Sequence, residues 1–288
     1  MVGPTAAGKS DLAVDLALAV GGEVVNADSM QLYAGMDVGT AKLTAAEQRG
    51  VPHHLLSVWP VTRTATAAAY QHECRAVVDA LLAAGRTPVL VGGSGLYLRA
   101  ALDRMEFPGT DPELRASLEA ALEHDGPLSL HARLTALAPE AAARMEPTNG
   151  RRIVRALEVV TLTGSMPGEM TSYEPFYETS YVGVDRADLA ERIALRVDRM
   201  WEQGLVEEVQ RLEADGLRDG VTASRALGYG QVLGALDGRW TLDEARTLTV
   251  TATRRFARRQ RAWFRRDPRV TWLDGALPRE ELLAAARS

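Results

Sequence analysis

The first ten residues, MVGPTAAGKS, have the types and spacing that could bind phosphate. They match the pattern G-x-x-x-x-G-K-[ST], in which a glycine-rich loop leads into a helix. Backbone N–H groups of such a loop surround phosphate oxygens, the lysine adds positive charge, and the hydroxyl suits Mg²⁺ as a ligand. The sequence therefore predicts a phosphate site, with Ser10 as the Mg²⁺ ligand, made by Gly3, Pro4, Thr5, Ala6, Ala7, Gly8, Lys9 and Ser10.

Two further residues could take part in chemistry near this loop. Asp28 follows the short β-branched segment from Glu23 to Asn26, and ligands bind at the carboxyl ends of parallel strands. A carboxylate there can hold a metal, act as a base or cap the next turn. Arg225 lies in ASRALGYGQ between two helical segments. It can be a solvated surface residue or a clamp on a diphosphate.

A second motif that is typical of nucleotide-hydrolysing proteins is absent from the sequence, because the candidate strand does not end in a carboxylate. Proteins that hydrolyse nucleoside triphosphates usually have an apolar strand ending in Asp, which helps to hold the metal. The candidate strand from Pro88 to Val91 continues instead into Gly92, Gly93 and Ser94. This weakens the interpretation as an ATPase or kinase, and a glycine-rich strand end allows a ligand or backbone to approach closely.

Arginines gather in two segments of a chain whose net charge is −5. The segment TRRFARRQRAWFRR, from Thr253 to Arg266, is either a solvated amphipathic helix with aromatic residues in the core or a surface for a phosphate backbone. Its arginine density favours the second interpretation. Helical spacing places four of its arginines on one face, namely Arg254, Arg258, Arg261 and Arg265. The second group is Arg151, Arg152 and Arg155.

Composition indicates a globular protein. The 288 residues allow one large domain or a domain with an insertion, and 46% hydrophobic with 25% charged residues is ordinary for such proteins. No apolar run approaches the roughly 18 residues of a membrane span, so we expect no membrane contact and a cytoplasmic location. The single cysteine excludes disulfides within the chain.

Strand and helix patterns alternate in the first part of the chain, which predicts parallel strands joined by right-handed crossovers. The expected fold is α/β, with a P-loop-type parallel sheet of about five strands flanked by helices. From 111 to 180 the patterns are helical, which predicts a helical insertion after the third strand. The core then comprises 1–110 and 181–288.

Six segments together resemble the tRNA dimethylallyltransferase (tRNA isopentenyl transferase) family. They occur in the order and spacing of that family along nearly the whole chain. The segments are GPTAAGKS, NADSMQLYAGMDVGTAK, PVLVGGSGLYLRA, NGRRIVRALE, ASRALGYGQ and RRFARRQRAWFRR.

The resemblance implies transfer of a dimethylallyl group from dimethylallyl diphosphate to N6 of adenosine 37 in tRNA. Asp28 would be the base that removes a proton from N6. Ser10 and Arg225 would stabilise the departing diphosphate, helped by Mg²⁺ and Lys9.

The resemblance also implies a set of residues that contact tRNA through its anticodon stem-loop. Thr40 and Lys42 lie in the loop that receives the flipped base. The insertion would hold the stem-loop, and the protein would be a monomer with no obligate protein partner. The implied tRNA contacts are Asp28, Ser29, Met30, Gln31, Ser94, Arg115, Arg151, Arg152, Ile153, Val154 and Arg155.

The chain departs from the family before its first glycine. The family has an apolar strand there, central in the sheet, and only Met1 and Val2 stand in its place. We expect a longer upstream segment in the natural protein, and we expect that adding it raises the melting temperature. Three alternatives to tRNA modification stay open: prenylation of free AMP or ADP, a P-loop small-molecule kinase, and an RNA-binding protein without catalysis.

Overall fold

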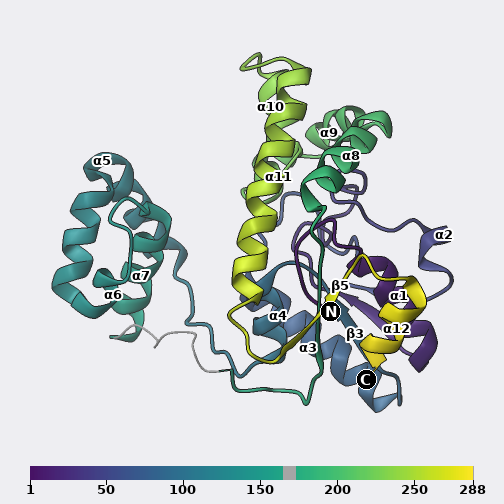
Figure 1. The fold of residues 1–288 in the computed structure, drawn as a ribbon. Coiled ribbons are helices and arrows are strands. Elements are labelled where there is room, and N and C mark those ends of the chain that lie inside the picture. Colours follow the sequence, from purple (N-terminus) through teal and green to yellow (C-terminus); the bar gives the residue numbers. More distant parts are fainter. Residues whose placement is uncertain (165–172, 288) are drawn as a thin grey trace. The chain divides into compact units, whose positions relative to one another are not determined.

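The computed structural model describes residues 1–164 and 173–287, which form two compact units. The core unit comprises Met1–Arg104 and Pro175–Ser288, and the helical unit comprises Met105–Glu174 (Figure 1). The helical unit thus begins and ends earlier than the predicted range 111–180, of which residues 165–172 lie outside the described part. Its end is earlier because the backbone N–H of Phe176 donates to Leu102 O (2.7 Å), which ties this segment to the core unit.

The core unit contains parallel strands arranged in two ladders. One ladder has the order β2-β1-β3 and the other pairs β4 with β5. This confirms a parallel α/β fold, although β2 was not predicted because it is only two residues long. The strands are β1 (Glu23–Asn26), β2 (His53–His54), β3 (Pro88–Val91), β4 (Tyr181–Asp185) and β5 (Val270–Asp274).

Met1 and Val2 lie between the two ladders. The N-terminal amine of Met1 donates to Leu90 O (2.6 Å) on the β3 side, and Gly92 N donates to Met1 O (3.2 Å). On the other side Val2 N donates to Val182 O (2.8 Å), and Val184 N donates to Val2 O (3.0 Å). These two residues therefore hold the central position that the family resemblance implies for the strand before the phosphate-binding loop.

Several helices of the core unit pack on these strands. Val24, Val89 and Val184 of the strands join Leu12 of α1 and Ile193 of α8 in one buried apolar cluster. Figure 1 shows α11 as the long helix that runs from α10 towards β5. The elements are α1 (Lys9–Val20), α2 (Ala45–Gln48), α3 (Ala67–Ala83), α4 (Gly95–Leu102), α8 (Leu189–Glu202), α9 (Leu205–Ala214), η1 (Leu217–Asp219), η2 (Ala223–Arg225), α10 (Tyr229–Leu236), α11 (Leu242–Phe264) and α12 (Arg279–Arg287).

The helical unit is built from α5 (Pro112–Leu137), α6 (Pro139–Ala143) and α7 (Gly150–Thr163). The helix α5 is interrupted at Gly126, which has a φ of 77° and directly precedes Pro127. Apolar side chains of α5 and α7 form a core of their own, which includes Leu118, Leu134 and Leu157. Within the described residues, no helix has the length and apolar character needed to cross a membrane.

Candidate active site

The predicted phosphate-binding loop connects Val2 to α1. Gly3 has a φ of 134°, and a Cβ atom there would lie 2.3 Å from the carbonyl oxygen of Val184, so only glycine fits. Gly8, with a φ of 93°, is the N-cap of α1, which begins at Lys9. The N–H groups of a first helical turn have no partner inside the helix. The loop therefore leads directly into a helix N-terminus, which is the arrangement that the motif predicts for an anion site.

Lys9 is buried at this helix start, and no carboxylate of the described residues pairs with it at contact distance. Its Nζ donates to Pro4 O (2.7 Å), and the side chain is 9% exposed. Burial, followed by the positive charge of Arg196, lowers the pKa of Lys9 to about 8, and Asp28 acts in the opposite direction. A buried cation without a paired anion favours binding of a negatively charged ligand.

Side chains from two distant helices hold the phosphate-binding loop. From α8, Arg196 donates to Thr5 Oγ1 (3.2 Å) and Arg192 donates to Ala6 O (2.8 Å). From α11, Gln260 accepts from Thr5 N (2.8 Å) and donates to Gly93 O (2.9 Å). Sequence reasoning missed all three residues. The only signal was the spacing of Arg192 and Arg196, which puts both on one face of a helix.

A cavity of about 110 Å³ lies against the loop. Ser10, Asp28, Gln31, Thr40 and Arg196 are among the residues that line it. The lining supplies two cations, Lys9 and Arg196, with hydroxyl and carboxylate oxygens beside them. This donor set suits a diphosphate.

The loop after β1 fixes Asp28 at the edge of this cavity. The backbone N–H of Asp28 donates to Asn26 Oδ1 (2.9 Å), and Asp28 Oδ1 accepts from Met30 N (2.9 Å). Burial raises the pKa of Asp28 above its usual value, although the Met30 N–H and the charge of Lys9 act in the opposite direction. A carboxylate with a raised pKa is a stronger base once ionised.

A second, larger cavity of about 320 Å³ shares Thr5, Asp28, Thr40 and Arg196 with the first. Arg225 lines it, together with apolar side chains that include Met200, Leu227 and Phe256. Three predicted residues that are distant in sequence are thus brought together, because Ser10 and Asp28 line the first cavity and Asp28 and Arg225 line the second. Asp28 therefore stands where a charged compartment meets a more apolar one.

Ser94 lies beside the Asp28 loop. Its hydroxyl accepts from Ser29 N (3.2 Å) and donates to Ser29 Oγ (3.3 Å). The glycines around Ser94 are required by the close approach of other parts of the protein. A Cβ atom would lie 2.2 Å from Ala27 O at Gly92, 2.1 Å from the Gln260 amide at Gly93 and 2.2 Å from the Trp263 ring at Gly95.

The predicted arginine face of α11 is largely occupied by bonds within the protein. Arg261 and Arg265 pair with Asp185 (2.8 and 3.1 Å), and Arg254 donates to Ala190 O (3.0 Å). Three of the four arginines predicted to share one face therefore already bond within the protein. The partner carboxylate could not be foreseen because Asp185, at the end of β4, meets α11 only in the folded chain. Arg255 and Arg258 are exposed.

In the helical unit, a buried glutamate organises some of the predicted tRNA contacts. Glu158, 0% exposed, accepts from Arg155 Nη1 (2.6 Å) and pairs with Arg115. Ile153 and Val154, also predicted to contact tRNA, are buried in the core of the unit, so their side chains do not face the solvent. Arg151 and Arg152 are exposed at the start of α7.

The residues present fit a hydrated Mg²⁺ ion that is bound mainly through the oxygens of a phosphate ligand. In the part of the chain that the structure describes, no group of three or more His, Cys, Asp or Glu side chains could hold a metal. Mg²⁺ in phosphate sites keeps several waters and uses few protein ligands beside the phosphate oxygens. The Ser10 hydroxyl in the first cavity fits such a role.

Comparisons with known proteins agree with this geometry. The family model described as IPP transferase matches residues 31–267. The chain is 65% identical over 280 residues to a tRNA dimethylallyltransferase of Streptomyces coelicolor, covering 96% of this chain and 90% of that protein. It is 64% identical over 275 residues to one from a Parafrankia species, covering 95% and 86%.

Solved structures show the same relationship. The full-length tRNA isopentenylpyrophosphate transferase of Bacillus halodurans has a TM-score of 0.74 and 38% identity, with 99% of this chain and 92% of that chain covered. A eukaryotic dimethylallyltransferase acting on tRNA has a TM-score of 0.83 and 25% identity, with 99% and 76% covered. By the family model and by these relatives, the chain belongs to the IPP transferase family.

Proposed function

We propose that this protein is a tRNA prenyltransferase that moves a dimethylallyl group from dimethylallyl diphosphate to N6 of adenosine 37. The observation that carries the proposal is the position of Asp28 between the two cavities. One cavity offers cations and a helix N-terminus to a diphosphate, and the other offers apolar surface to a prenyl group and a base. The relatives named above are tRNA dimethylallyltransferases, which supports tRNA as the acceptor.

The first cavity would bind the diphosphate through the loop from Gly3 to Ser10. Lys9 and Arg196 would place two positive charges beside its oxygens. Bound Mg²⁺ would neutralise part of the diphosphate charge, with the Ser10 hydroxyl as its protein ligand. Arg196 is an addition to the residues expected from the sequence.

The transfer forms one C–N bond and breaks one C–O bond. The lone pair of adenine N6 attacks the first carbon of the prenyl group, and the electrons of the breaking C–O bond remain on the diphosphate. The Asp28 carboxylate accepts the proton that N6 loses. Lys9, Arg196 and Arg225 stabilise the negative charge that develops on the departing diphosphate.

The acceptor base must leave the anticodon loop to reach Asp28. Ser29 and Met30 line the second cavity, and Gln31 lines the first, so the segment after Asp28 would contact the base. The exposed arginines of α11 and α7 would hold the phosphate backbone, since such contacts supply much of the affinity for nucleic acid. Ser94 would contact the same RNA beside Ser29.

The test is a transfer assay with a choice of acceptors. Purified protein is incubated with dimethylallyl diphosphate and Mg²⁺ and either unmodified tRNA, AMP or ADP, and the nucleosides are analysed by mass spectrometry. We expect isopentenyladenosine from tRNA alone. Product from AMP or ADP would support the free-nucleotide alternative. Absence of any product together with ATP hydrolysis that requires Lys9 would support the kinase alternative.

A further inference from the structure

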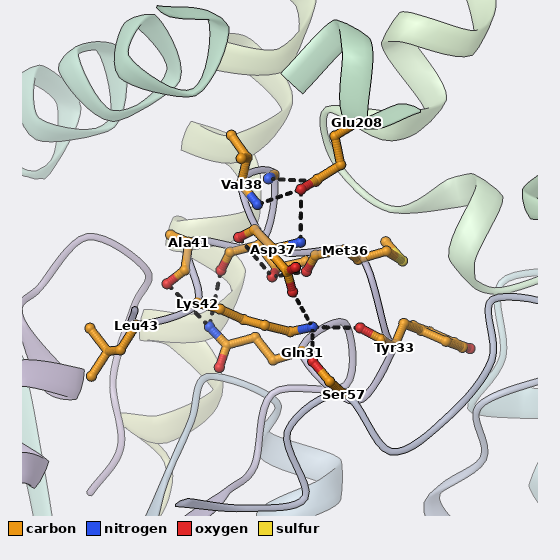
Figure 2. A network of polar contacts seen from close by, with 12 residues as sticks. Gln31, Tyr33, Met36, Asp37, Val38, Ala41, Lys42, Leu43, Ser57 and Glu208 are labelled. Carbon is orange, nitrogen blue, oxygen red and sulfur yellow. Dashed lines mark hydrogen bonds and ion pairs between the residues drawn. The ribbon is translucent and has the colours of Figure 1, made fainter. Parts of the chain in front are cut away.

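A buried glutamate outside both cavities bonds to two segments that help to line the second cavity beside Asp28. The first wall is the loop 37–40, and the second wall is the turn 225–229. Glu208 of α9 is 2% exposed. Its carboxylate accepts from three successive backbone N–H groups, those of Asp37 (3.0 Å), Val38 (2.8 Å) and Gly39 (3.1 Å) (Figure 2). It also accepts from the hydroxyl of Tyr229 (2.5 Å). A buried carboxylate is costly unless hydrogen bonds satisfy it, so these contacts hold Glu208 and its partners in one arrangement.

The backbone that Glu208 holds belongs to the first wall. Residues 37–39 lie in a loop outside helices and strands, so their N–H groups need partners from elsewhere in the protein. Gly39 and Thr40 line the second cavity, and Thr40 also lines the first. Gln31 donates to Thr40 O (3.0 Å), which connects this loop to the segment after Asp28.

Lys42 holds the same loop from the opposite side (Figure 2). Its Nζ donates to Tyr33 O (2.5 Å), Asp37 Oδ1 (2.8 Å) and Ser57 Oγ (2.7 Å). Lys42 bonds neither to Glu208 nor to Tyr229. It therefore ties the loop to Tyr33 and Ser57 but not to the start of α10. Glu208, by contrast, bonds both to this loop and to Tyr229 at the start of α10.

The second wall ends at Tyr229, the first residue of α10. The turn before it carries Arg225 and Leu227, both of which line the second cavity. Gly230 N donates to Ala226 O (3.0 Å), so the turn is continuous with the start of α10. Tyr229 also packs against Gly39, where a Cβ atom would lie 2.5 Å from the ring. The Glu208–Tyr229 bond therefore fixes Arg225 relative to the loop that carries Thr40.

We propose that Glu208 is a positioning residue for prenyl transfer. It would set the separation between Thr40 and Arg225, which line the second cavity from two different segments. This inference rests on the proposed transfer reaction. Glu208 does not line either cavity, so it acts through Thr40 and Arg225 rather than on the substrates. Small displacements of positioned groups reduce rates much more than they reduce binding when the binding contacts lie elsewhere. Here the diphosphate contacts lie at Lys9 and Arg196.

The test compares Glu208→Gln with Glu207→Gln, a change at the exposed neighbour on the same helix. Glutamine has the size of glutamate, but one of its two terminal atoms is an NH₂ group. This group would face the N–H and O–H donors that bond to the Glu208 carboxylate. We expect kcat to fall roughly tenfold to a hundredfold, with KM for dimethylallyl diphosphate within about twofold of wild type. Glu207→Gln should match wild type. Equal kcat for the two variants would overturn the inference.

A double-mutant cycle with Arg225→Ala tests the route of the effect. If Glu208 acts through Arg225, Glu208→Gln should lower kcat much less in the Arg225→Ala background than in the wild type, because coupled residues are non-additive. Additive losses would contradict this route. Tyr229→Phe removes one hydroxyl and is the milder variant if Glu208→Gln folds poorly; it should lower kcat in the same direction, and unchanged kcat would contradict the account.

Amide hydrogen exchange gives a readout that does not need activity. Exchange at residues 37–39 should become faster in Glu208→Gln than in Glu207→Gln, since these N–H groups bond to the Glu208 carboxylate. Unchanged exchange would contradict the inference whatever the activity. Absence of product from wild-type protein would instead contradict the proposed reaction, so the two failures are distinguishable.

Discussion

Asp28 and Arg225 line one cavity, although Asp28 follows β1 and Arg225 lies in the turn before α10. Asp28 also lines the cavity of the phosphate-binding loop, where Arg225 does not. In the proposed reaction the carboxylate accepts a proton at the junction of the two cavities, and the guanidinium stabilises the departing diphosphate from the second cavity. This arrangement separates the two roles in the reaction and makes each open to a distinct test.

Replacing Arg225 with Ala should lower kcat by roughly a hundredfold, because one aimed donor to developing charge is lost. Arg225 is exposed, so the melting temperature should not change. Steady-state kinetics of Arg225→Ala and of Arg211→Ala, an exposed arginine on α9, would separate the effect from a general loss of positive charge. An unchanged kcat in Arg225→Ala would remove Arg225 from the mechanism.

Replacing Arg196 with Gln should raise KM for dimethylallyl diphosphate by roughly tenfold, since a charge-assisted contact to the diphosphate becomes neutral. Arg199→Gln is the matched control, because Arg199 is exposed on the same helix and lines neither of the two cavities. Binding of inorganic diphosphate by calorimetry would report the same loss without catalysis. Equal affinity in both variants would show that Arg196 only braces the loop.

Lys9 should make stability and diphosphate binding depend on pH in opposite ways. Its pKa in the folded protein is about 8, below the ordinary value of 10.5, so the unfolded state binds more protons between these values. Stability should therefore rise as pH increases from about 8 to 10.5, because the cost of the buried charge is relieved. Diphosphate affinity should fall over the same range as Lys9 loses its charge.

The variant Lys9→Met keeps an apolar side chain in place of the buried cation. It should remain folded and lose the pH dependence of both properties between about 8 and 10.5. Thermal melts and diphosphate titrations at several pH values provide the measurement. A persistent dependence in Lys9→Met would assign the effect to another group.

Arginines of the helical unit should divide into two classes. Arg151→Ala with Arg152→Ala should weaken tRNA binding and reduce its salt dependence, because both side chains are exposed at the start of α7. Arg133→Ala, an exposed arginine on α5, is the control. Filter binding at several salt concentrations would show no difference from this control if α7 does not contact RNA.

Arg115→Ala should act differently and lower stability. Burial would raise the pKa of Glu158, but bonds from Arg155 and Arg115 hold that pKa below its usual value. Losing one partner leaves a buried carboxylate less well satisfied, at a cost of about 1–3 kcal/mol. Denaturant unfolding would measure this change, and an unaltered free energy of unfolding would show that Arg155 alone satisfies Glu158.

Local patterns were sufficient to predict the loop from Gly3 to Ser10, the strands β1 and β3 and the second half of α11. Each of these follows from neighbouring residues: glycine spacing, β-branched runs, or apolar residues at helical spacing. The position of Asp28 followed from the rule that ligands bind at the ends of parallel strands.

The remaining parts of the site depend on pairs of residues that are distant in sequence. Glu208 and Gln260 look like ordinary helix-surface residues until the loops that they bond are placed beside them. The bonds of the α11 arginines could not be predicted for the same reason, because Asp185 is adjacent to Arg261 only in the fold. The sequence could not indicate which polar residues would be buried.

The central claim is that Asp28 removes the proton from N6 of the acceptor adenosine. Single-turnover transfer to unmodified tRNA should be compared in wild type and Asp28→Asn, with tRNA affinity measured in parallel by gel shift. The account predicts that Asp28→Asn binds tRNA as wild type does and that isopentenyladenosine forms more slowly by roughly a hundredfold or more. Formation of product at the wild-type rate would contradict it.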